Sequence, residues 1–375
     1  MKVLFAADMV PMPSNEALFS QGNMEELLGD GILSEIEGHD FFVFNLETPL
    51  CDKLTPIDKY GINLSARTST VRAIKRMNPA LICLANNHIL DQGPEGLSET
   101  VNTLQSNKLN YIGAGMNITE AQKPGILEKD SIKIGVYNCA EHEFSIAGND
   151  SAGANPYDPL HSFDQVQDLK KECDYVVVVY HGGKEHYRYP SPGLRKTCRH
   201  FVEKGADVVL CQHSHCIGCK EEYLKGTIVY GQGNFLFDDN DNEFWNTSIL
   251  VGIDFTKERK EVRYIPIKKD GCRVRIADDG GESIIDEFNK RSEEIKKDGF
   301  IEDQYRLFTK KSFCGYVATI SGKKFYLRLF NKILGGRLYK NYYKHDALLA
   351  LYNYMNCEAH QELLTEALRI ESKKD

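Results

Sequence analysis

The sequence predicts an α/β protein with a largely parallel sheet, and two observations lead to this class. Short apolar runs alternate with amphipathic segments from the start of the chain to about residue 270, which is typical of repeated βαβ units. The runs are continuously apolar, rich in Val, Ile, Leu and Phe, as parallel strands buried on both faces are. The 375 residues, 42% of them hydrophobic, are enough for a substantial core.

The expected elements follow in chain order. Strands are predicted at 2–7, 41–46, 80–85, 132–139, 175–180, 207–212, 227–231, 247–255 and 261–267. Helices are predicted at 23–37, 68–77, 94–107, 162–172 and 191–204. Pro94, Ser191 and Pro192 stand where helix N-termini favour them. A charged turn separates the last two strands, so we expect an antiparallel hairpin and a second layer of strands.

The pattern changes beyond about residue 280 to amphipathic helical segments, at 283–297, 323–333 and 345–368. We therefore predict an α/β domain over 1–270 and a mainly helical appendage over 271–375. Within the appendage, 304–344 contains ten Lys or Arg, ten aromatic residues and no Asp or Glu. Such a stretch suits an anionic polymer or a peripheral membrane contact. The alternative, which we favour, is that its aromatics pack on the α/β domain.

Composition points to a cytoplasmic protein. The apolar stretches fall short of the ~18 residues that span a bilayer, and the N-terminus shows no signal-peptide pattern, so we expect no transmembrane segment. Eleven cysteines, an odd number scattered along the chain, suggest free thiols in a reducing compartment. Cys216 and Cys219 have CxxC spacing without a second pair, which favours structural thiols. We expect no nucleic-acid partner, and the oligomeric state stays open.

Polar residues follow five of the predicted strands. They are Asp8, Asn45 with Glu47, Asn87 with His88, His181, and His213 with His215. Because open α/β sheets bind ligands beyond the carboxyl ends of their strands, we expect these side chains to meet at one rim.

Each of these residues also has an ordinary explanation. Asp and Asn favour the turns where strands end, and a lone histidine after a strand is more often structural than a ligand. Two imidazoles two residues apart, at His213 and His215, nevertheless suit a metal. Asn87 offers an amide oxygen, and Asp91 lies where it can orient His88. Together the residues indicate a metal-dependent site.

The chain resembles the capsule-synthesis CapA family, within the metallophosphatase-like (calcineurin-type) superfamily. The matching motifs are Asp8 after the first strand, NLE at 45–47, ANNHILDQG at 85–93, YHGGKE at 180–185, YPSPG at 189–193, GADVVLCQHSH at 205–215 and YGQGNFLFDD at 230–239. The resemblance implies an α/β/β/α sandwich of two mixed sheets flanked by helices. It also implies a catalytic acid, His88, held by Asp91. The metal ligands it implies are Asp8, Glu47, Asn87, His181, His213 and His215.

Three positions depart from the family pattern. The wider superfamily begins with Asp-x-His, whereas Met9 and Val10 follow Asp8 here, a difference that bears on a second tightly held metal. Gly182 replaces the family's usual aromatic, and His186 replaces its usual Tyr. We therefore expect a different substrate pocket.

We predict metal-assisted hydrolysis of a phosphoester or amide-like bond, with one or two divalent Mn, Fe or Zn ions that suit the nitrogen and oxygen ligands. The resemblance links the protein to capsule and poly-γ-glutamate biosynthesis, with an anionic polymer, a peptide or a phosphorylated molecule as substrate. Two alternatives stay open: a non-catalytic polymer-binding or assembly component, and a metal-independent acid/base enzyme that uses His88 and Asp91. The candidate substrate contacts are Asn45, Glu185, His186 and Asn234.

Overall fold

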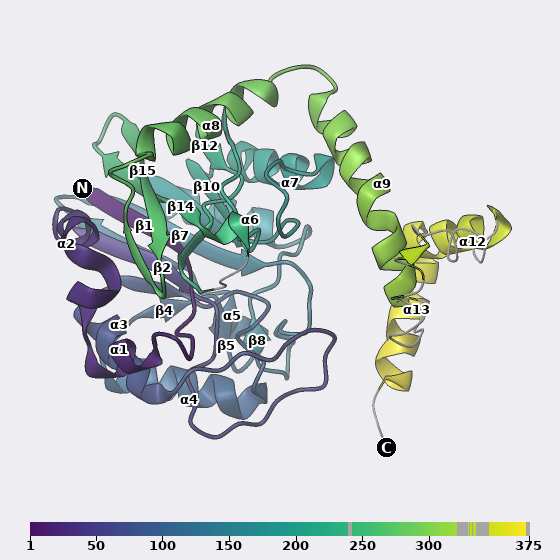
Figure 1. Ribbon diagram of the computed structural model, residues 1–375, viewed down its shortest axis with the longest axis horizontal. Coiled ribbons are helices and arrows are strands. Elements are labelled where there is room, and N and C mark those ends of the chain that lie inside the picture. The colour runs from purple at the N-terminus through teal and green to yellow at the C-terminus, as the bar shows by residue number, and fades with distance from the viewer. Residues whose placement is uncertain (239–241, 321–328, 330, 332, 335–344, 373–375) are drawn as a thin grey trace. The chain divides into compact units, whose positions relative to one another are not determined.

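The structure, a computed structural model, describes residues 1–238, 242–320, 329, 331, 333–334 and 345–372. The chain divides into two compact units, Met1–Glu302 and Asp303–Asp375. The first unit contains both large sheets and every candidate site residue (Figure 1).

The larger sheet has the strand order β16-β15-β14-β1-β2-β3-β4, with β13 also paired to β1. Strands β1 to β4 are parallel, while β14 to β16 are antiparallel and confirm the predicted hairpin. The strands are β1 (Lys2–Met9), β2 (Phe41–Leu46), β3 (Leu81–Cys83), β4 (Tyr111–Ile112), β13 (Asn234–Leu236), β14 (Thr247–Phe255), β15 (Lys260–Asp270) and β16 (Arg273–Ile276).

The smaller sheet has the order β11-β12-β10-β9-β7-β6. Its inner strands are parallel, and β6 and β11 pair antiparallel at its edges. The strands are β6 (Gly125–Lys129), β7 (Ile132–Ala140), β9 (Tyr175–His181), β10 (Val208–Gln212), β11 (Lys220–Tyr223) and β12 (Gly226–Val229). A separate short pair joins β5 (Ala114–Gly115) to β8 (Gly153–Ala154).

Most helices of the first unit begin and end close to the predicted positions, whereas the short helices α1 (Glu16–Gln21) and α5 (Ile118–Ala121) were not predicted. The other helices are α2 (Met24–Glu37), α3 (Val71–Arg76), α4 (Gly93–Ser106), α6 (Ser162–Glu172), α7 (Pro192–Glu203) and α8 (Gly281–Glu294), with single 3-10 turns η1 (Thr68–Thr70) and η2 (Glu243–Trp245). The Ser191 hydroxyl accepts a hydrogen bond from the Leu194 amide at 3.0 Å, so it caps α7 as its position predicts.

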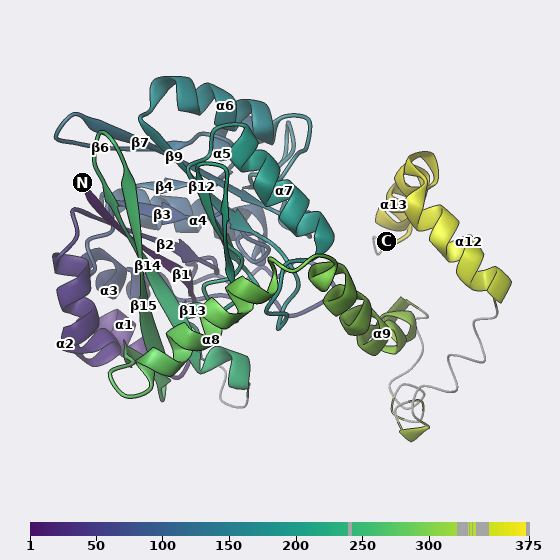
Figure 2. The same cartoon turned by 90° about the horizontal axis from the view of Figure 1, so that it is seen from above.

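The two sheets stack face to face between two layers of helices. Successive side chains of a strand point to opposite faces, so β1 places Leu4 against the helices while Val3 packs between the sheets. In β9, Val177 faces the other sheet and Val178 packs under α6 and α7. Figure 2 shows α6 and α7 beyond the smaller sheet and α1 to α3 beyond the larger one. The expected α/β/β/α sandwich is confirmed.

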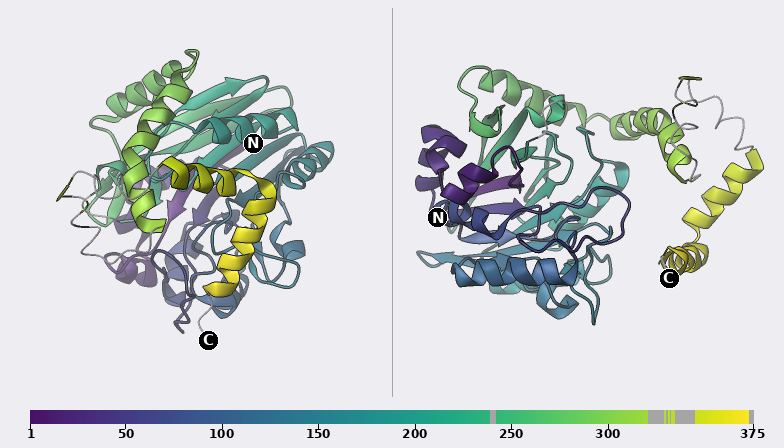
Figure 3. Two further views of the ribbon diagram at one scale, coloured as in Figure 1. Left: turned by 90° about the vertical axis from the view of Figure 1, so that its right-hand side faces the viewer. Right: turned by 60° about the horizontal axis from the view of Figure 1, so that its bottom comes forward.

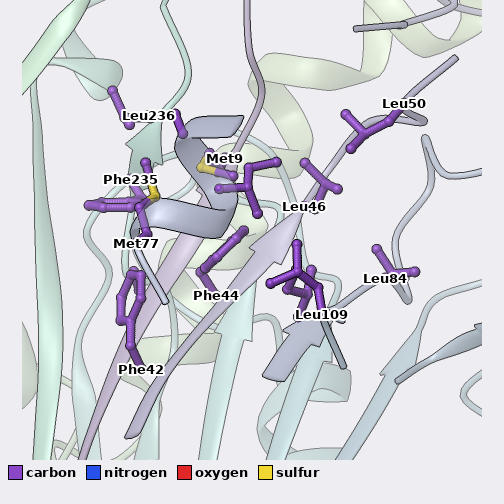
Figure 4. Close-up of a cluster of buried hydrophobic side chains, with 14 of the residues drawn as sticks. Met9, Phe42, Phe44, Leu46, Leu50, Met77, Leu84, Leu109, Phe235 and Leu236 are labelled. Carbon is purple, nitrogen blue, oxygen red and sulfur yellow. The ribbon is translucent and has the colours of Figure 1, made fainter. Parts of the chain in front are cut away.

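The core between the larger sheet and its helices is continuous and apolar. Phe42 and Phe44 on β2 have ring centroids 5.5 Å apart, and Phe235 meets Phe42 edge-on at 5.9 Å (Figure 4). Met9 and Leu46, the last residues of their strands, are fully buried in the same cluster. The rigid packing therefore reaches the strand ends, where the candidate site residues begin.

The first unit extends past residue 270, where patterning placed the domain boundary, because α8 completes the core. Phe288 is fully buried and its ring lies 4.9 Å from that of Tyr264 on β15. The second unit contains most of α9 (Phe300–Ile320), then α12 (His345–Asn356) and α13 (Glu358–Glu371). The single helix predicted at 345–368 is thus two helices, divided at Cys357.

Much of the basic aromatic stretch at 304–344, including most of the helix predicted at 323–333, lies outside the described residues. Among the helices that the structure does describe, none combines the length and the apolar character that crossing a membrane requires. All eleven cysteines are free thiols. Burial raises the pKa of Cys216 to about 11, which fits a structural thiol better than a reactive one.

A charged cluster ties β11 to α7. The Glu221 carboxylate accepts hydrogen bonds from Arg195 at 2.9 Å, from Arg199 at 2.5 Å and from the Tyr230 hydroxyl at 2.7 Å. Burial raises the pKa of Glu221, but these hydrogen bonds outweigh it and leave the pKa below its ordinary value. The ionised form therefore stabilises the fold above the unfolded-state pKa, and this contribution is lost as the pH falls through the folded-state pKa.

We expect Glu221→Gln to lower the free energy of unfolding at neutral pH by about 1–3 kcal/mol, because it removes charge-assisted hydrogen bonds. The difference in the free energy of unfolding between the variant and wild type should become smaller below about pH 4, where Glu221 becomes protonated in the wild type. Urea denaturation across this pH range measures both effects. The exposed neighbour Glu222→Gln serves as the control, and equal losses in the two variants would contradict the prediction.

Candidate metal centre

Side chains from both sheets meet beyond the carboxyl ends of their parallel strands. From the larger sheet come Asp8 at the end of β1, Glu47 after β2 and Asn87 after β3; from the smaller sheet come His181 at the end of β9 and His213 and His215 after β10. All six are buried. The arrangement follows from the topology, because parallel strands end at the same edge of a sheet and the two sheets are stacked.

Glu47 lies at the centre of this group. Its carboxylate belongs to two sets whose ligand atoms all lie within 4.8 Å of one another, one with His213 and His215, the other with Asp8 and His181. Both of its oxygens are buried, and neither has a hydrogen-bond partner among the described residues. A buried carboxylate without hydrogen bonds is costly unless a cation compensates it.

Asp8 is held in place by the backbone and by an amide. Its Oδ1 accepts a hydrogen bond from Asn45 Nδ2 at 2.8 Å, and its Oδ2 accepts one from the His213 amide at 3.0 Å. The carboxylate lies 3.8 Å from His181 Nδ1 and 3.7 Å from His215 Nδ1. The Glu47 amide donates to the Met9 carbonyl, which fixes the spacing of the two acids.

Two amide side chains orient the histidines. His181 Nε2 lies 2.9 Å from Asn87 Oδ1 and 3.3 Å from Glu47 Oε1. His215 Nδ1 lies 2.8 Å from Asn234 Oδ1, so its Nε2 is the nitrogen left for a ligand. His213 is buried with Nδ1 unpaired among the described residues.

The charges of the centre interact strongly. Burial and the adjacent Glu47 charge raise the pKa of Asp8 to about 6, against the opposing effect of His181 and His215. For Glu47, burial also raises the pKa, but the two histidines outweigh it and bring the pKa to about 2. Burial lowers the pKa of His181, yet the acids outweigh this and raise it. Two close carboxylates repel each other when both are ionised, and a divalent cation bound between them removes this repulsion.

The His88 imidazole lies beside this group and is held by Asp91. His88 Nδ1 lies 2.6 Å from Asp91 Oδ2, and the Asp91 side chain is fully buried. The His88 side chain is 13% exposed. Asp91 thereby fixes Nδ1 and leaves Nε2 as the nitrogen that can exchange a proton with a bound molecule.

A lysine that patterning missed completes this pair. Lys59 forms an ion pair with Asp91 Oδ1, and its Nζ lies 3.4 Å from His88 Nδ1. Its side chain is 3% exposed, although it belongs to the long loop at 48–67, visible as a dark blue trace in Figure 3, right. The loop is anchored at the same point, because the Leu64 amide donates to Asp91 Oδ2 at 2.6 Å.

We expect Lys59→Met to lower the free energy of unfolding by about 1–3 kcal/mol, because Asp91 then keeps its buried charge with one donor fewer. Chemical denaturation compares the variant with Lys53→Met, which removes an exposed lysine from the same loop. A Lys59→Met protein as stable as the Lys53→Met control would show that the ion pair contributes nothing.

Three histidines of the region adopt left-handed backbone conformations. The φ angles are 57° at His186, 80° at His213 and 51° at His215. A non-glycine residue held at positive φ costs of order 1–3 kcal/mol and persists only where its surroundings enforce it. The turns after β9 and β10 are therefore locally strained at the candidate centre.

The four predicted substrate contacts occupy different positions. Asn45 is fully buried and both ends of its amide are engaged, by Asp8 and by Asn86 Nδ2 at 3.0 Å, so it orients the acids. Asn234 contacts His215, and Glu185 is half-buried in the turn after β9.

His186 makes the most specific contacts of these four residues. Its Nε2 accepts hydrogen bonds from Trp245 Nε1 at 3.0 Å and from Asn242 Nδ2 at 2.9 Å. The His215 and Trp245 rings lie 4.8 Å apart. The single tryptophan of the chain is thus packed on the candidate centre.

Glu143 was also missed, although a signal for it existed. It follows β7, and its Oε2 accepts a hydrogen bond from Asn87 Nδ2 at 3.2 Å while its Oε1 lies 4.0 Å from His213 Nε2. The same strand-end rule, applied to the apolar run at 132–139, would have identified the Glu-His-Glu that follows it.

The donor set fits a divalent transition metal. It combines carboxylate oxygens, an amide oxygen and imidazole nitrogens, and the unpaired Glu47 carboxylate and His213 Nδ1 are buried where a cation would satisfy them. Most of the other polar atoms of the set are held by neighbouring amides, which is the second layer of contacts that orients metal ligands in proteins.

Comparison with known proteins finds relatives among capsule biosynthesis proteins. "Capsule biosynthesis protein CapA" of Bacillus anthracis is 31% identical over 213 residues, which cover 54% of this chain and about half (52%) of that protein. "PGA biosynthesis protein CapA" of Bacillus subtilis is 29% identical over 292 residues, 72% of this chain and 73% of that one. A phosphatase structure from Mycoplasma pneumoniae aligns with a TM-score of 0.45 at 13% identity, over 72% of this chain and 94% of that one.

The family model described as "Bacterial capsule synthesis protein PGA_cap" matches residues 2–239. The match covers well over half of the chain and contains every residue of the candidate centre. The chain belongs to the bacterial capsule synthesis protein family PGA_cap.

Proposed function

We propose that this protein is a metal-dependent hydrolase that cleaves a phosphoester or amide bond in the biosynthesis of capsule or poly-γ-glutamate. The observation that carries the proposal is the buried Glu47 carboxylate, which has no hydrogen bond among the described residues and lies within ligand distance of three histidines and a second acid. The names of the Bacillus relatives supply the biosynthetic setting.

Six residues would hold the metal: Asp8, Glu47, Asn87, His181, His213 and His215. A divalent Mn, Fe or Zn ion supplies Lewis-acid chemistry, which polarises a substrate oxygen and makes water easier to deprotonate. Val10, two residues after Asp8, is buried among apolar side chains and offers no side-chain ligand. One or two ions per chain are expected.

His88 would donate a proton to the leaving group through Nε2. Asp91 holds its other ring nitrogen and balances the charge of the protonated imidazole, and Lys59 holds Asp91. A positioned acid of this kind contributes typically 10²–10⁴-fold to a rate. Asn45 would fix Asp8 so that the acids keep their spacing.

The test begins with protein purified without an affinity metal and loaded with Mn, Fe or Zn. Each form is assayed with p-nitrophenyl phosphodiesters and with γ-glutamyl peptides. We expect hydrolysis that depends on the loaded ion, stops when a chelator removes it and returns when it is added back.

Two results would overturn the proposal. Hydrolysis by protein that elemental analysis shows to be metal-free would favour an acid/base enzyme built on His88 and Asp91. Binding of γ-linked polyglutamate that is unchanged by His88→Ala, with no hydrolysis by any loaded form, would favour a polymer-binding component.

A further inference from the structure

A cavity of about 300 Å³ in the first unit is lined by two arginines, Arg188 and Arg291. Arg188 lies two residues after His186 in the segment between β9 and α7, and Arg291 lies on α8. The hydroxyl residues Thr247 and Ser283 line the same cavity. Glu287 also lines the cavity, so it offers several hydrogen-bond donors and two positive charges beside one carboxylate.

The cavity adjoins the metal centre through stacked rings. The Arg188 guanidinium lies 4.8 Å from the centroid of the Phe244 ring, and Phe244 stacks on His186 at 5.2 Å. The His186 ring is in turn 6.4 Å from that of His215. Phe244 and His186 thus stand in contact between Arg188, on the cavity, and His215, on the centre.

The two guanidinium groups are held side by side by the backbone. Arg188 Nη1 donates to the Ile217 carbonyl at 3.1 Å, and Arg291 Nε donates to the next carbonyl, that of Gly218, at 2.7 Å. Each guanidinium carries five N–H donors, so these two bonds leave most of the donors for a ligand.

The positive charges are poorly compensated. Burial, and then the neighbouring charge of Arg188, lower the pKa of Arg291. Arg291 Nη1 lies 3.8 Å from Glu287 Oε2, but the Glu287 side chain is 55% exposed and its other oxygen lies 3.3 Å from Lys290 Nζ. In the described part of the chain, Arg188 makes no ion pair with a carboxylate within 4.0 Å.

We propose that this cavity is a substrate subsite that binds an oxyanion, a carboxylate or phosphate group separate from the bond that is cleaved. Planar guanidinium forks match such groups with paired hydrogen bonds. Holding one charged group of a substrate here would position a neighbouring group at the metal centre. The assignment of the oxyanion to the substrate rests on the proposed function, whereas the binding of the anion does not.

The test is isothermal titration calorimetry on the full chain, freed of metal with chelator, at matched ionic strength. The probes are inorganic phosphate and γ-linked pentaglutamate, and their comparison distinguishes a phosphate from a carboxylate ligand. We expect saturable binding of at least one probe, weakened at least about tenfold in Arg188→Gln because a charge-assisted pair of hydrogen bonds is lost. The affinity of Arg188→Lys should lie between those of wild type and Arg188→Gln, because lysine keeps the positive charge but lacks the planar pair of donors.

The matched control is Arg259→Gln, which removes one positive charge from a side chain that is 72% exposed. It should bind the probes like wild type. The Trp245 fluorescence, from the only tryptophan of the chain, gives a second reading of occupancy beside Phe244 and confirms that each variant is folded.

Binding of neither probe by wild type, or equal affinity in Arg188→Gln and wild type, would overturn the subsite. The two proposals fail separately. Anion binding without hydrolysis by any metal-loaded form would contradict the proposed hydrolase activity but support the anion site. Hydrolysis with a wild-type KM in Arg188→Gln would contradict the substrate subsite but support the hydrolase activity.

Discussion

Glu47→Gln should empty the metal centre and leave the fold intact. Glu47 is common to both groups of potential ligands, so the substitution removes a charged oxygen donor from each. Loss of a residue that merely orients a ligand costs 10–100-fold in metal affinity, and loss of this shared ligand should cost more than about 100-fold. Elemental mass spectrometry of purified protein, reported as metal per chain, measures the result.

The stability of the metal-free protein should fall as well. Burial raises the pKa of Glu47, but His215 and His181 outweigh it and hold the pKa at about 2, so the folded protein favours the ionised carboxylate. We therefore expect metal-free Glu47→Gln to unfold at a lower urea concentration than metal-free wild type at neutral pH. Glu221→Gln is the matched control, because it should keep its metal and lose stability. A Glu47→Gln protein with wild-type metal content would exclude Glu47 as a ligand.

His88→Ala should lower kcat by about 10²–10⁴-fold while the protein keeps its metal. The expectation follows from geometry, since Asp91 engages Nδ1 and the ring is partly exposed beside the centre. Steady-state kinetics on the substrate that the metal-loaded wild type cleaves, with metal content measured on the same samples, separates loss of the acid from loss of the ion.

The control for this variant is His161→Ala, which removes an exposed histidine at the start of α6. It should leave both kcat and metal content unchanged. If His88→Ala turned over at the wild-type rate with its full complement of metal, another group would have to protonate the leaving group.

Much of the centre could be predicted because it is built on strand ends. The run YVVVVYH signals a buried strand, and a buried strand in a parallel sheet dictates where His181 must lie. The same holds for Asp8 and His213. Patterning did not say which face of a strand meets the other sheet, because Val177 and Val178 look alike in sequence and face different layers.

Apart from Glu143, the parts that were missed lack a local signal. Lys59 reaches Asp91 from a loop without helix or strand periodicity, over a separation of 32 residues. The two-residue strands β4, β5 and β8 are too short for any periodic pattern. The extent of the first unit depends on Phe288, whose burial reflects a tertiary contact with Tyr264 that an amphipathic helix alone does not reveal.

The left-handed backbone at His186, His213 and His215 lowers the stability of the protein at residues beside or within the candidate centre. Glycine or asparagine would adopt these φ angles at lower cost, so substitution by either residue should relax the turns and raise the stability of the protein. Histidine persists at such positions only if its imidazole is needed. In a chain of this fold that has lost the activity, we therefore expect glycine or asparagine to replace histidine at these three positions first.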